Sequence, residues 1–156
     1  MKVRLFSLFL AIFLFTLTFV PTVNAATHEN VSTEIVYLDN GYYCVFETVE
    51  GEEHAIARST TYTKSGSRTA RLYNNAGELA LSLTVHGNFS YNGATATATS
   101  ASYTYSIEKN SWKFDSGNAS RSGATVTATA TFKYLLIFDT ETLTVSLTCS
   151  PTGVLS

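Results

Sequence analysis

Apolar and polar residues alternate along most of the chain, and this alternation predicts β-strands. In residues 78–91 every second position is apolar except for a glycine, and polar side chains stand between them. The apolar positions are Leu79, Leu81, Leu83, Val85, Phe89 and Tyr91. Residues 142–149 repeat the pattern, and their apolar face carries Leu143, Val145, Leu147 and Cys149. A period of two over such lengths is typical of a half-buried strand and not of a helix.

The uncharged segment 92–107, NGATATATSASYTYSI, has the composition of a low-complexity linker but the pattern of a strand. Asn92-Gly93 is the signal of a type I′ hairpin turn, because both central residues of that turn need a positive φ. After the turn Thr alternates with Ala. β-Branched Thr suits a pleated surface, and Ala suits a face that is crowded by bulky side chains. Because an uncharged strand at a sheet edge invites aggregation, we expect this segment to lie inside a sheet.

Turn signals divide the chain at short intervals. They stand at 39–41, 65–67, 74–77, 92–93, 108–111, 122–123 and 139–141. Residues 88–99 and 118–129 share Asn, Ser, Gly, Ala and a run of alternating Thr, which indicates two equivalent hairpins. The spacing predicts roughly eight to ten strands and no amphipathic helix. We therefore expect an all-β fold, a single antiparallel β-sandwich built from a hairpin meander, with a flattened β-barrel as the alternative.

The first 25 residues have the pattern of a signal peptide. Lys2 and Arg4 precede an apolar run at 5–20, and small residues before Ala26 form a cleavage site. A membrane span is the alternative, because the run approaches the length that crosses a bilayer. The basic residues before the run and the cleavage site after it favour secretion, with no membrane attachment after cleavage. The predicted parts are a signal peptide at 1–25, a flexible N-terminus at 26–32 and one β domain at 33–156.

Charge is scarce and unevenly placed. The chain has 10 Lys and Arg against 12 Asp and Glu, a formal net charge of −2. It has no basic stripe, so no nucleic-acid partner is expected. Residues 26–57 hold seven acids and neither Lys nor Arg, whereas 58–133 hold eight bases and three acids. We interpret 26–57 as a solvated acidic segment rather than one that steers a partner.

Two cysteines follow the predicted signal peptide, Cys44 and Cys149. The alternation of the strands places both thiols on the core-facing side. Two free, buried thiols would leave the same sequence pattern as a disulfide. Export permits a disulfide, and closing a loop of about 100 residues would contribute roughly 4.7 kcal/mol in the chain-entropy model. We expect the bridge, and therefore expect the two cysteines on neighbouring or facing strands with Cα atoms about 4.4–6.8 Å apart.

The histidines and acids show no catalytic or metal-binding spacing. His28, His54 and His86 form no i, i+2 or i, i+4 pair, and the HExxH, EF-hand and GxSxG motifs do not occur. The cluster Glu47, Glu50, Glu52, Glu53 and His54 could collect a hard cation, but a solvated loop is the favoured interpretation. We therefore expect no catalytic residue, no metal and no cofactor, and we place a hydrolase below the non-catalytic alternatives.

Aromatic side chains are the remaining candidates for a binding surface. Tyr103 and Tyr105 share one face of a predicted strand, and Trp112 shares a face of the next strand with Phe114. Rings of this kind stack on sugars and line concave apolar sites. The candidate ligand-binding residues are therefore Trp112, Tyr103 and Tyr105. The alternative, which we favour for Trp112 and Phe114, is that these rings are large core residues opposite the small Ala side chains.

Several segments resemble a group of short exported proteins from Gram-positive, Clostridia-like bacteria. The segments are KSGSRTARLYNNAGELALSLTVHGNFSYNG (64–93), NSWK (110–113), SGNASRSGATVTATATF (116–132) and SLTCSPTGVLS (146–156). The resemblance covers about two-thirds of the chain and rests on strand patterning. It implies an all-β fold and secretion, and it carries over no activity and no site residues. Members with extra Cys after the NG turn have an additional bridge that the Thr and Ala of this chain cannot form.

Export, one β domain and the lack of catalytic spacing predict a non-catalytic extracellular binding module. Extracellular glycans, including those of a cell wall, or a cell-surface protein are the partners we expect first. The alternative is a structural protein that assembles through the hydroxyl-rich strands at 94–106 and 123–131.

Overall fold

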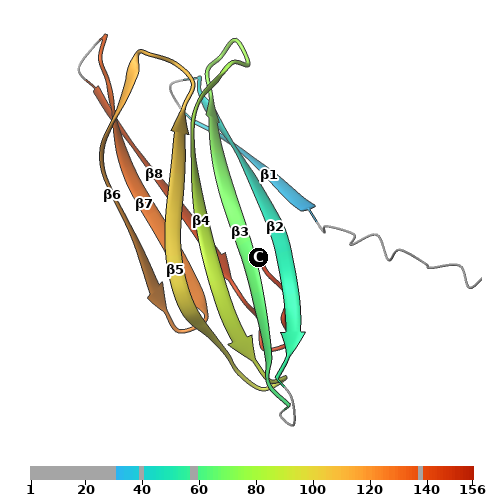
Figure 1. Cartoon of the computed structure of the whole chain (residues 1–156). Coiled ribbons are helices and arrows are strands. Elements are labelled where there is room, and N and C mark those ends of the chain that lie inside the picture. Colours follow the sequence, from blue (N-terminus) through green and yellow to red (C-terminus); the bar gives the residue numbers. More distant parts are fainter. Residues whose placement is uncertain (1–30, 39–40, 57–59, 137–138) are drawn as a thin grey trace, which may run out of the picture.

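The computed structural model describes residues 31–38, 41–56, 60–136 and 139–156, and these ranges contain eight strands (Figure 1). The strands are β1 (Val31–Tyr37), β2 (Tyr43–Ala55), β3 (Tyr62–Tyr73), β4 (Leu79–Tyr91), β5 (Ala96–Ile107), β6 (Trp112–Ser122), β7 (Thr125–Tyr134) and β8 (Asp139–Thr148). The predicted signal peptide lies outside the described residues. β1 begins two residues before the predicted start of the domain. No helix in the described ranges is long and apolar enough to cross a membrane.

The strands form two antiparallel sheets that pack face to face. One sheet has the order β1-β2-β3-β4-β5 and the other has the order β6-β7-β8, so every hydrogen-bonded neighbour is also a neighbour in sequence. No strand pairing among the described residues closes the sheets into a barrel. The predicted β-sandwich built from a meander is therefore confirmed, and the barrel alternative is wrong.

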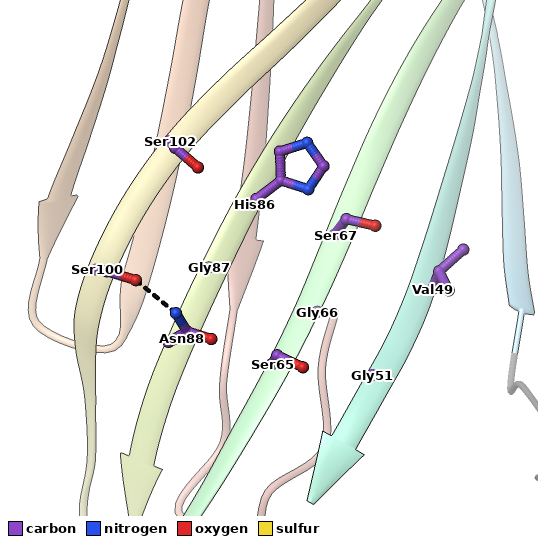
Figure 2. Close-up of a pocket in the computed structure, with 10 residues that line it drawn as sticks. All are labelled: Val49, Gly51, Ser65, Gly66, Ser67, His86, Gly87, Asn88, Ser100 and Ser102. Atoms are coloured by element: carbon purple, nitrogen blue, oxygen red, sulfur yellow. Dashed lines mark hydrogen bonds between the residues drawn. The ribbon is translucent and has the colours of Figure 1, made fainter.

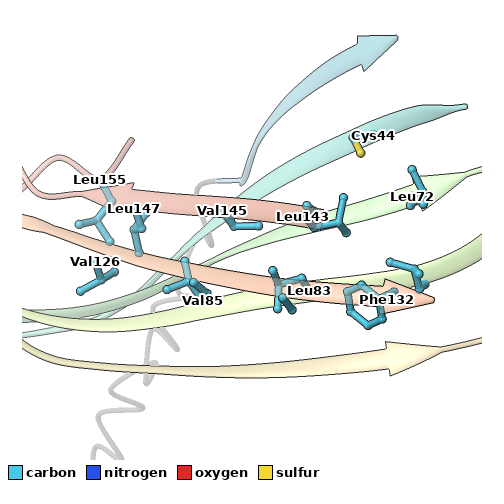
Figure 3. Close-up of a cluster of buried hydrophobic side chains, with 14 of the residues drawn as sticks. Cys44, Leu72, Leu83, Val85, Val126, Phe132, Leu143, Val145, Leu147 and Leu155 are labelled. Atoms are coloured by element: carbon cyan, nitrogen blue, oxygen red, sulfur yellow. The ribbon is translucent and has the colours of Figure 1, made fainter. Parts of the chain in front are cut away.

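The core lies between the sheets and follows the predicted alternation (Figure 3). The largest buried apolar side chains are Phe89, Phe132, Leu72, Leu81, Leu83, Leu147, Val85, Val126 and Val145. The apolar rows predicted at 78–91 and 142–149 are thus core rows of β4 and β8. Fully burying each such side chain stabilises the fold by roughly 1.5–3 kcal/mol.

Hydroxyl side chains cover the outer face of the three-stranded sheet. Directly opposite Thr and Ser residues of β7 and β8 exchange hydrogen bonds along the ladder. The oxygen–oxygen distances are 2.9 Å for Thr125–Thr148, 2.9 Å for Thr127–Ser146, 3.3 Å for Thr129–Thr144 and 3.1 Å for Thr131–Thr142. The Ala residues between the threonines of β7 point inward and are buried. The alternation of Thr and Ala therefore gives this strand one face toward solvent and one face that packs closely in the core.

The segment 96–107 is an edge strand, so its predicted place inside a sheet is wrong. β5 pairs only with β4, and the other sheet protects its open edge near Ala98. The Ala98 N–H donates to the Gly123 carbonyl at 2.8 Å, and Arg121 Nη1 donates to the Ala98 carbonyl at 3.0 Å. A β-bulge opposite Asn88 and Phe89 also interrupts the regular edge. These contacts and the bulge thus protect the exposed edge of β5 from pairing with another chain, although β5 does not lie inside the sheet as the sequence suggested.

Most predicted turns are confirmed. The turns at 74–77, 92–93, 108–111 and 122–123 each join two strands, and Gly93 and Gly123 have φ of 85° and 57°. The two-residue type I′ form predicted for Asn92-Gly93 is wrong, because Tyr91 pairs with Ala96 and the loop spans residues 92–95. The predicted turn at 65–67 is wrong, because it lies within β3. Gly66 is needed there for close packing, since a Cβ at this position would collide with Leu155. The signal at 139–141 is the start of β8, and residues 39–40 of the first turn lie outside the described residues.

The predicted Cys44–Cys149 disulfide is wrong, although both thiols do face the core. Both cysteines are free and buried. Cys44 lies within electrostatic reach of Glu141, near the start of β8, and Cys149 follows the end of that strand. Eight residues at roughly 3.3 Å each separate these positions by about 26 Å. Figure 3 shows Cys44 beside Leu72, at the end of the core opposite to Leu155. Strand parity reports the face of a side chain and not its position along the sheet.

Both thiols should resist labelling until the protein unfolds. Burial and the charge of Glu141 raise the pKa of Cys44 to about 11, and burial also raises the pKa of Cys149. The reactive thiolate is therefore scarce at neutral pH. We expect a thiol-specific reagent to modify the folded protein only after denaturant is added, whereas a Thr97→Cys variant should react at once on its exposed strand position. Rapid labelling of the unsubstituted folded chain would show that this burial is wrong.

Candidate functional site

A pocket of about 260 Å³ opens at the end of the sandwich where β2, β6 and β8 begin and where β3 and β7 end. Its wall combines aromatic rings with carboxylates. The lining residues are Tyr42, Leu72, Trp112, Tyr134, Asp139, Thr140 and Glu141. They come from both sheets, so the pocket exists only when the sandwich is assembled. We call it the aromatic pocket.

The register of the three-stranded sheet places the rings and the carboxylates side by side. Trp112 on β6 is opposite Tyr134 on β7, and Tyr134 is opposite Asp139 on β8. Glu141 stands two residues further along β8, on the same side as the buried Leu143. Because successive inward side chains of a strand are two residues apart, Asp139 and Glu141 extend the core-facing row of β8 into the pocket.

The five-stranded sheet supplies the opposite wall. Tyr42 directly precedes β2 and packs against the core with its ring edge toward Trp112, at a centroid distance of 6.4 Å and an interplanar angle of 82°. Tyr134, the cross-strand neighbour of Trp112 in the three-stranded sheet, contacts the indole at 4.9 Å and 49°. Trp112 therefore contacts one tyrosine from each wall of the pocket and is only 9% exposed. Such contacts between rings stabilise the pocket wall and fix the orientation of the indole.

The aromatic pocket carries negative charge without a matching cation. None of its lining residues is Lys, Arg or His, and no ion pair within the described ranges includes Asp139 or Glu141. Burial raises the pKa of the Glu141 carboxyl, and the charge of Asp139 raises it further. Removal of a carboxylate from water without a nearby cation disfavours its charged form, which accounts for this direction.

Trp112, Tyr103 and Tyr105 were the ring residues predicted from the sequence, and the structure distributes them over different contacts. Trp112 lines the aromatic pocket. Tyr105 stacks on Phe114 at 4.2 Å with an interplanar angle of 4°. The Tyr103 hydroxyl would lie 2.8 Å from a Cβ built on Gly117. Tyr103 and Tyr105 thus pack across the two edge strands β5 and β6.

Trp112 is the only residue lining the aromatic pocket that was predicted from the sequence, and four of those missed carry its other rings and its carboxylates. They are Tyr42, Tyr134, Asp139 and Glu141. The sequence does contain a signal for the two acids. Leu143 and Val145 face the core, and counting back in steps of two places the carboxylates at 141 and 139 on the same side of the strand. A carboxylate at a core-facing position is unusual enough to mark a candidate site.

The acidic cluster at 47–54 lies in β2, so the predicted loop is wrong, although residues 51–55 of this strand are exposed to solvent. Its members pair with neighbouring side chains on β2 and β3. The pairs are Glu47 with Arg71, Glu50 with Lys64 at 2.9 Å, and Glu52 with His54 at 3.2 Å. Among the described residues, no group of His, Cys, Asp and Glu could hold a metal ion. Lys64 and Arg71 of β3 thus offset part of the negative charge of this cluster.

A second hollow of about 250 Å³ lies on the outer face of the five-stranded sheet (Figure 2). Short serine side chains of β3 and β5 surround His86 and Asn88 of β4. Asn88 Nδ2 donates to Ser100 Oγ at 2.7 Å, and His86 Nε2 is 3.0 Å from Thr104 Oγ1. The lining of this hollow offers hydrogen bonds, but it has no Phe, Tyr or Trp ring and no carboxylate that would orient a ligand.

Comparisons with protein-family models, curated proteins and solved structures give no match for this chain. The resemblance to short exported bacterial proteins therefore stays a prediction from the sequence. The function has to be inferred from the chemistry of the aromatic pocket.

Proposed function

We propose that the protein is a secreted, non-catalytic binding module that holds its ligand in the aromatic pocket. The observation that carries this proposal is the contact of Trp112 with Tyr42 and Tyr134 in a pocket that two carboxylates also line. Ring faces bind the C–H surface of a sugar or a similar flat group, and carboxylates accept hydrogen bonds from hydroxyl or amine groups. A glycan on a cell wall or host surface is the first ligand class to test.

The arrangement of the carboxylates supports binding rather than hydrolysis. A glycosidase uses two carboxyl groups that flank the scissile bond, one on each side. Here Asp139 and Glu141 come from the same face of one strand. Both therefore approach a ligand from one wall of the pocket, whereas the opposite wall presents Tyr42 and Leu72.

A Trp112→Leu variant should lose affinity for the ligand by about tenfold, because the loss of ~1.4 kcal/mol of ring contact changes a dissociation constant by that factor. Leucine keeps the site apolar and limits the cavity left by the indole. Binding would be measured by screening the chain without its predicted signal peptide against glycans and cell-wall polymers, and then by calorimetry with the best ligand.

Tyr73→Ala is the matched control. Tyr73 stacks on Tyr43 at 5.1 Å and is outside the lining of the aromatic pocket. This variant should bind like the unsubstituted protein. If no polymer or oligosaccharide binds, the proposed function is wrong. If a ligand binds equally to a folded Trp112→Leu protein, the aromatic pocket is not the site.

A further inference from the structure

We propose that the aromatic pocket selects ligands that carry an organic ammonium group, such as an amino sugar with a free amine. The inference rests on the proposed function, because it concerns the same pocket, and it adds the charge of the ligand. It follows from three features of the described residues, namely the rings, the unpaired carboxylates and the energetic cost of Glu141.

The rings form an environment that attracts cations. The face of an aromatic ring carries negative potential, and a cation within about 6 Å of the ring centroid is attracted to it, most strongly by tryptophan. Tyr42, Trp112 and Tyr134 surround one pocket from two sheets. An ammonium group with apolar substituents can contact several of these rings at once, whereas a neutral group gains only their apolar contact.

The carboxylates lack the partners that most other acids among the described residues have. Elsewhere in the described chain, most acids pair with Lys or Arg from another strand or turn. Such pairs are Glu34–Arg68, Glu47–Arg71 and Asp115–Lys133. Asp139 and Glu141 have no such pair among the described residues, and no basic residue lines their pocket. A cationic ligand would supply the missing positive charge, and an anionic ligand would be repelled.

Glu141 costs stability in the free protein. The titratable groups around it are Asp139 on its own strand, Cys44 on β2, and Tyr42 and Tyr134 beside the pocket. None of these side chains can supply a positive charge. Burial and Asp139 raise the pKa of Glu141 in the folded protein. The contribution of Glu141 to folding stability is therefore most favourable below the pKa that this group has in the unfolded chain, and it is lost as the pH rises through the pKa that it has in the folded protein. A bound cation would offset this cost.

The test compares choline with 3,3-dimethylbutan-1-ol, a neutral molecule of nearly the same shape. The chain contains a single tryptophan, and it lies in the pocket, so its fluorescence reports binding directly. We expect choline to bind about tenfold more tightly than the neutral molecule. Oligosaccharides of glucosamine should likewise bind more tightly than their N-acetylated forms. The affinity for choline should fall as the pH drops through the pKa of Glu141.

Glu141→Gln should raise the melting temperature at neutral pH and lower the affinity for choline at least about tenfold. Glu108→Gln, which makes the same change at an exposed position, should alter neither. If Glu141 affected only the stability of the fold, Glu141→Gln would change the melting temperature without lowering the affinity for choline.

The possible results separate the two proposals. Equal binding of the neutral and charged ligands, with loss in Trp112→Leu, would overturn the preference for ammonium and leave the binding function standing. If neither choline nor a glucosamine oligosaccharide binds while another glycan does, the ammonium inference is wrong. If no ligand of any class binds, both proposals fail.

Discussion

A chain that ends at Leu143 should fail to fold, although it keeps β1 to β7 and the first half of β8. The deletion removes four buried side chains. They are Val145, Leu147, Cys149 and Leu155. Burial of the three aliphatic ones contributes roughly 5–9 kcal/mol, which is comparable to a total stability of about 5–15 kcal/mol. The deletion also exposes the core beneath β3 and β4 to water. Circular dichroism and thermal melting of the shortened chain would measure the loss.

A chain that ends at Cys149 provides the comparison for this deletion. It keeps β8 and loses Leu155, together with the backbone pairing of Thr148 with Ser156. We expect this chain to fold with reduced stability, because one buried leucine contributes only about 1.5–3 kcal/mol. A native-like spectrum with a sigmoidal melt for the chain that ends at Leu143 would contradict the role assigned to β8.

Phe132→Ala should lower the free energy of unfolding by about 3–5 kcal/mol. Phe132 is fully buried in β7, with Phe114 edge-on at 5.9 Å and Tyr105 edge-on at 6.0 Å. Its neighbours belong to both sheets and are held by backbone ladders, so they cannot collapse into the cavity left by the ring. Urea denaturation monitored by circular dichroism would give the change.

Thr131→Ala is the control on the same strand. Thr131 points outward and shares a hydrogen bond with Thr142 at 3.1 Å. The expected loss is about 0.5–1.5 kcal/mol, the usual net value of one hydrogen bond. A loss below about 1 kcal/mol for Phe132→Ala, or equal losses for the two variants, would mean that the space around Phe132 is not closely packed.

The sequence was sufficient to predict the strands and most of their inward residues. The alternation at 78–91 identifies the core row of β4, and the Gly-containing turns at 92–93 and 122–123 locate two hairpins. These features are local, because side-chain parity and turn conformation depend on a few neighbouring residues. The order of strands in a sheet is not local, and this is why β5 was misplaced.

The site was predicted only in part, for a related reason. Trp112 is recognisable as the chain's only tryptophan, but its partners come from segments about 70 residues before it and 20–30 residues after it. Only the register of β6, β7 and β8 brings Tyr134 and Glu141 to the same end of the sandwich. The error for Cys44 and Cys149 has the same origin, since both face the core but at opposite ends of it.

Among the eight described strands, the turn at 108–111 is the single chain connection between the two sheets. Either sheet alone would expose an apolar face to water, so neither is a stable folding unit. The molecule should therefore unfold in one cooperative step. The turn acts as a tether that sets the effective concentration of one sheet for the other. Its short length therefore contributes to stability by limiting the entropy lost when the sheets meet, in addition to the hydrogen bonds that the Glu108 and Lys109 N–H groups donate to the Ala80 carbonyl.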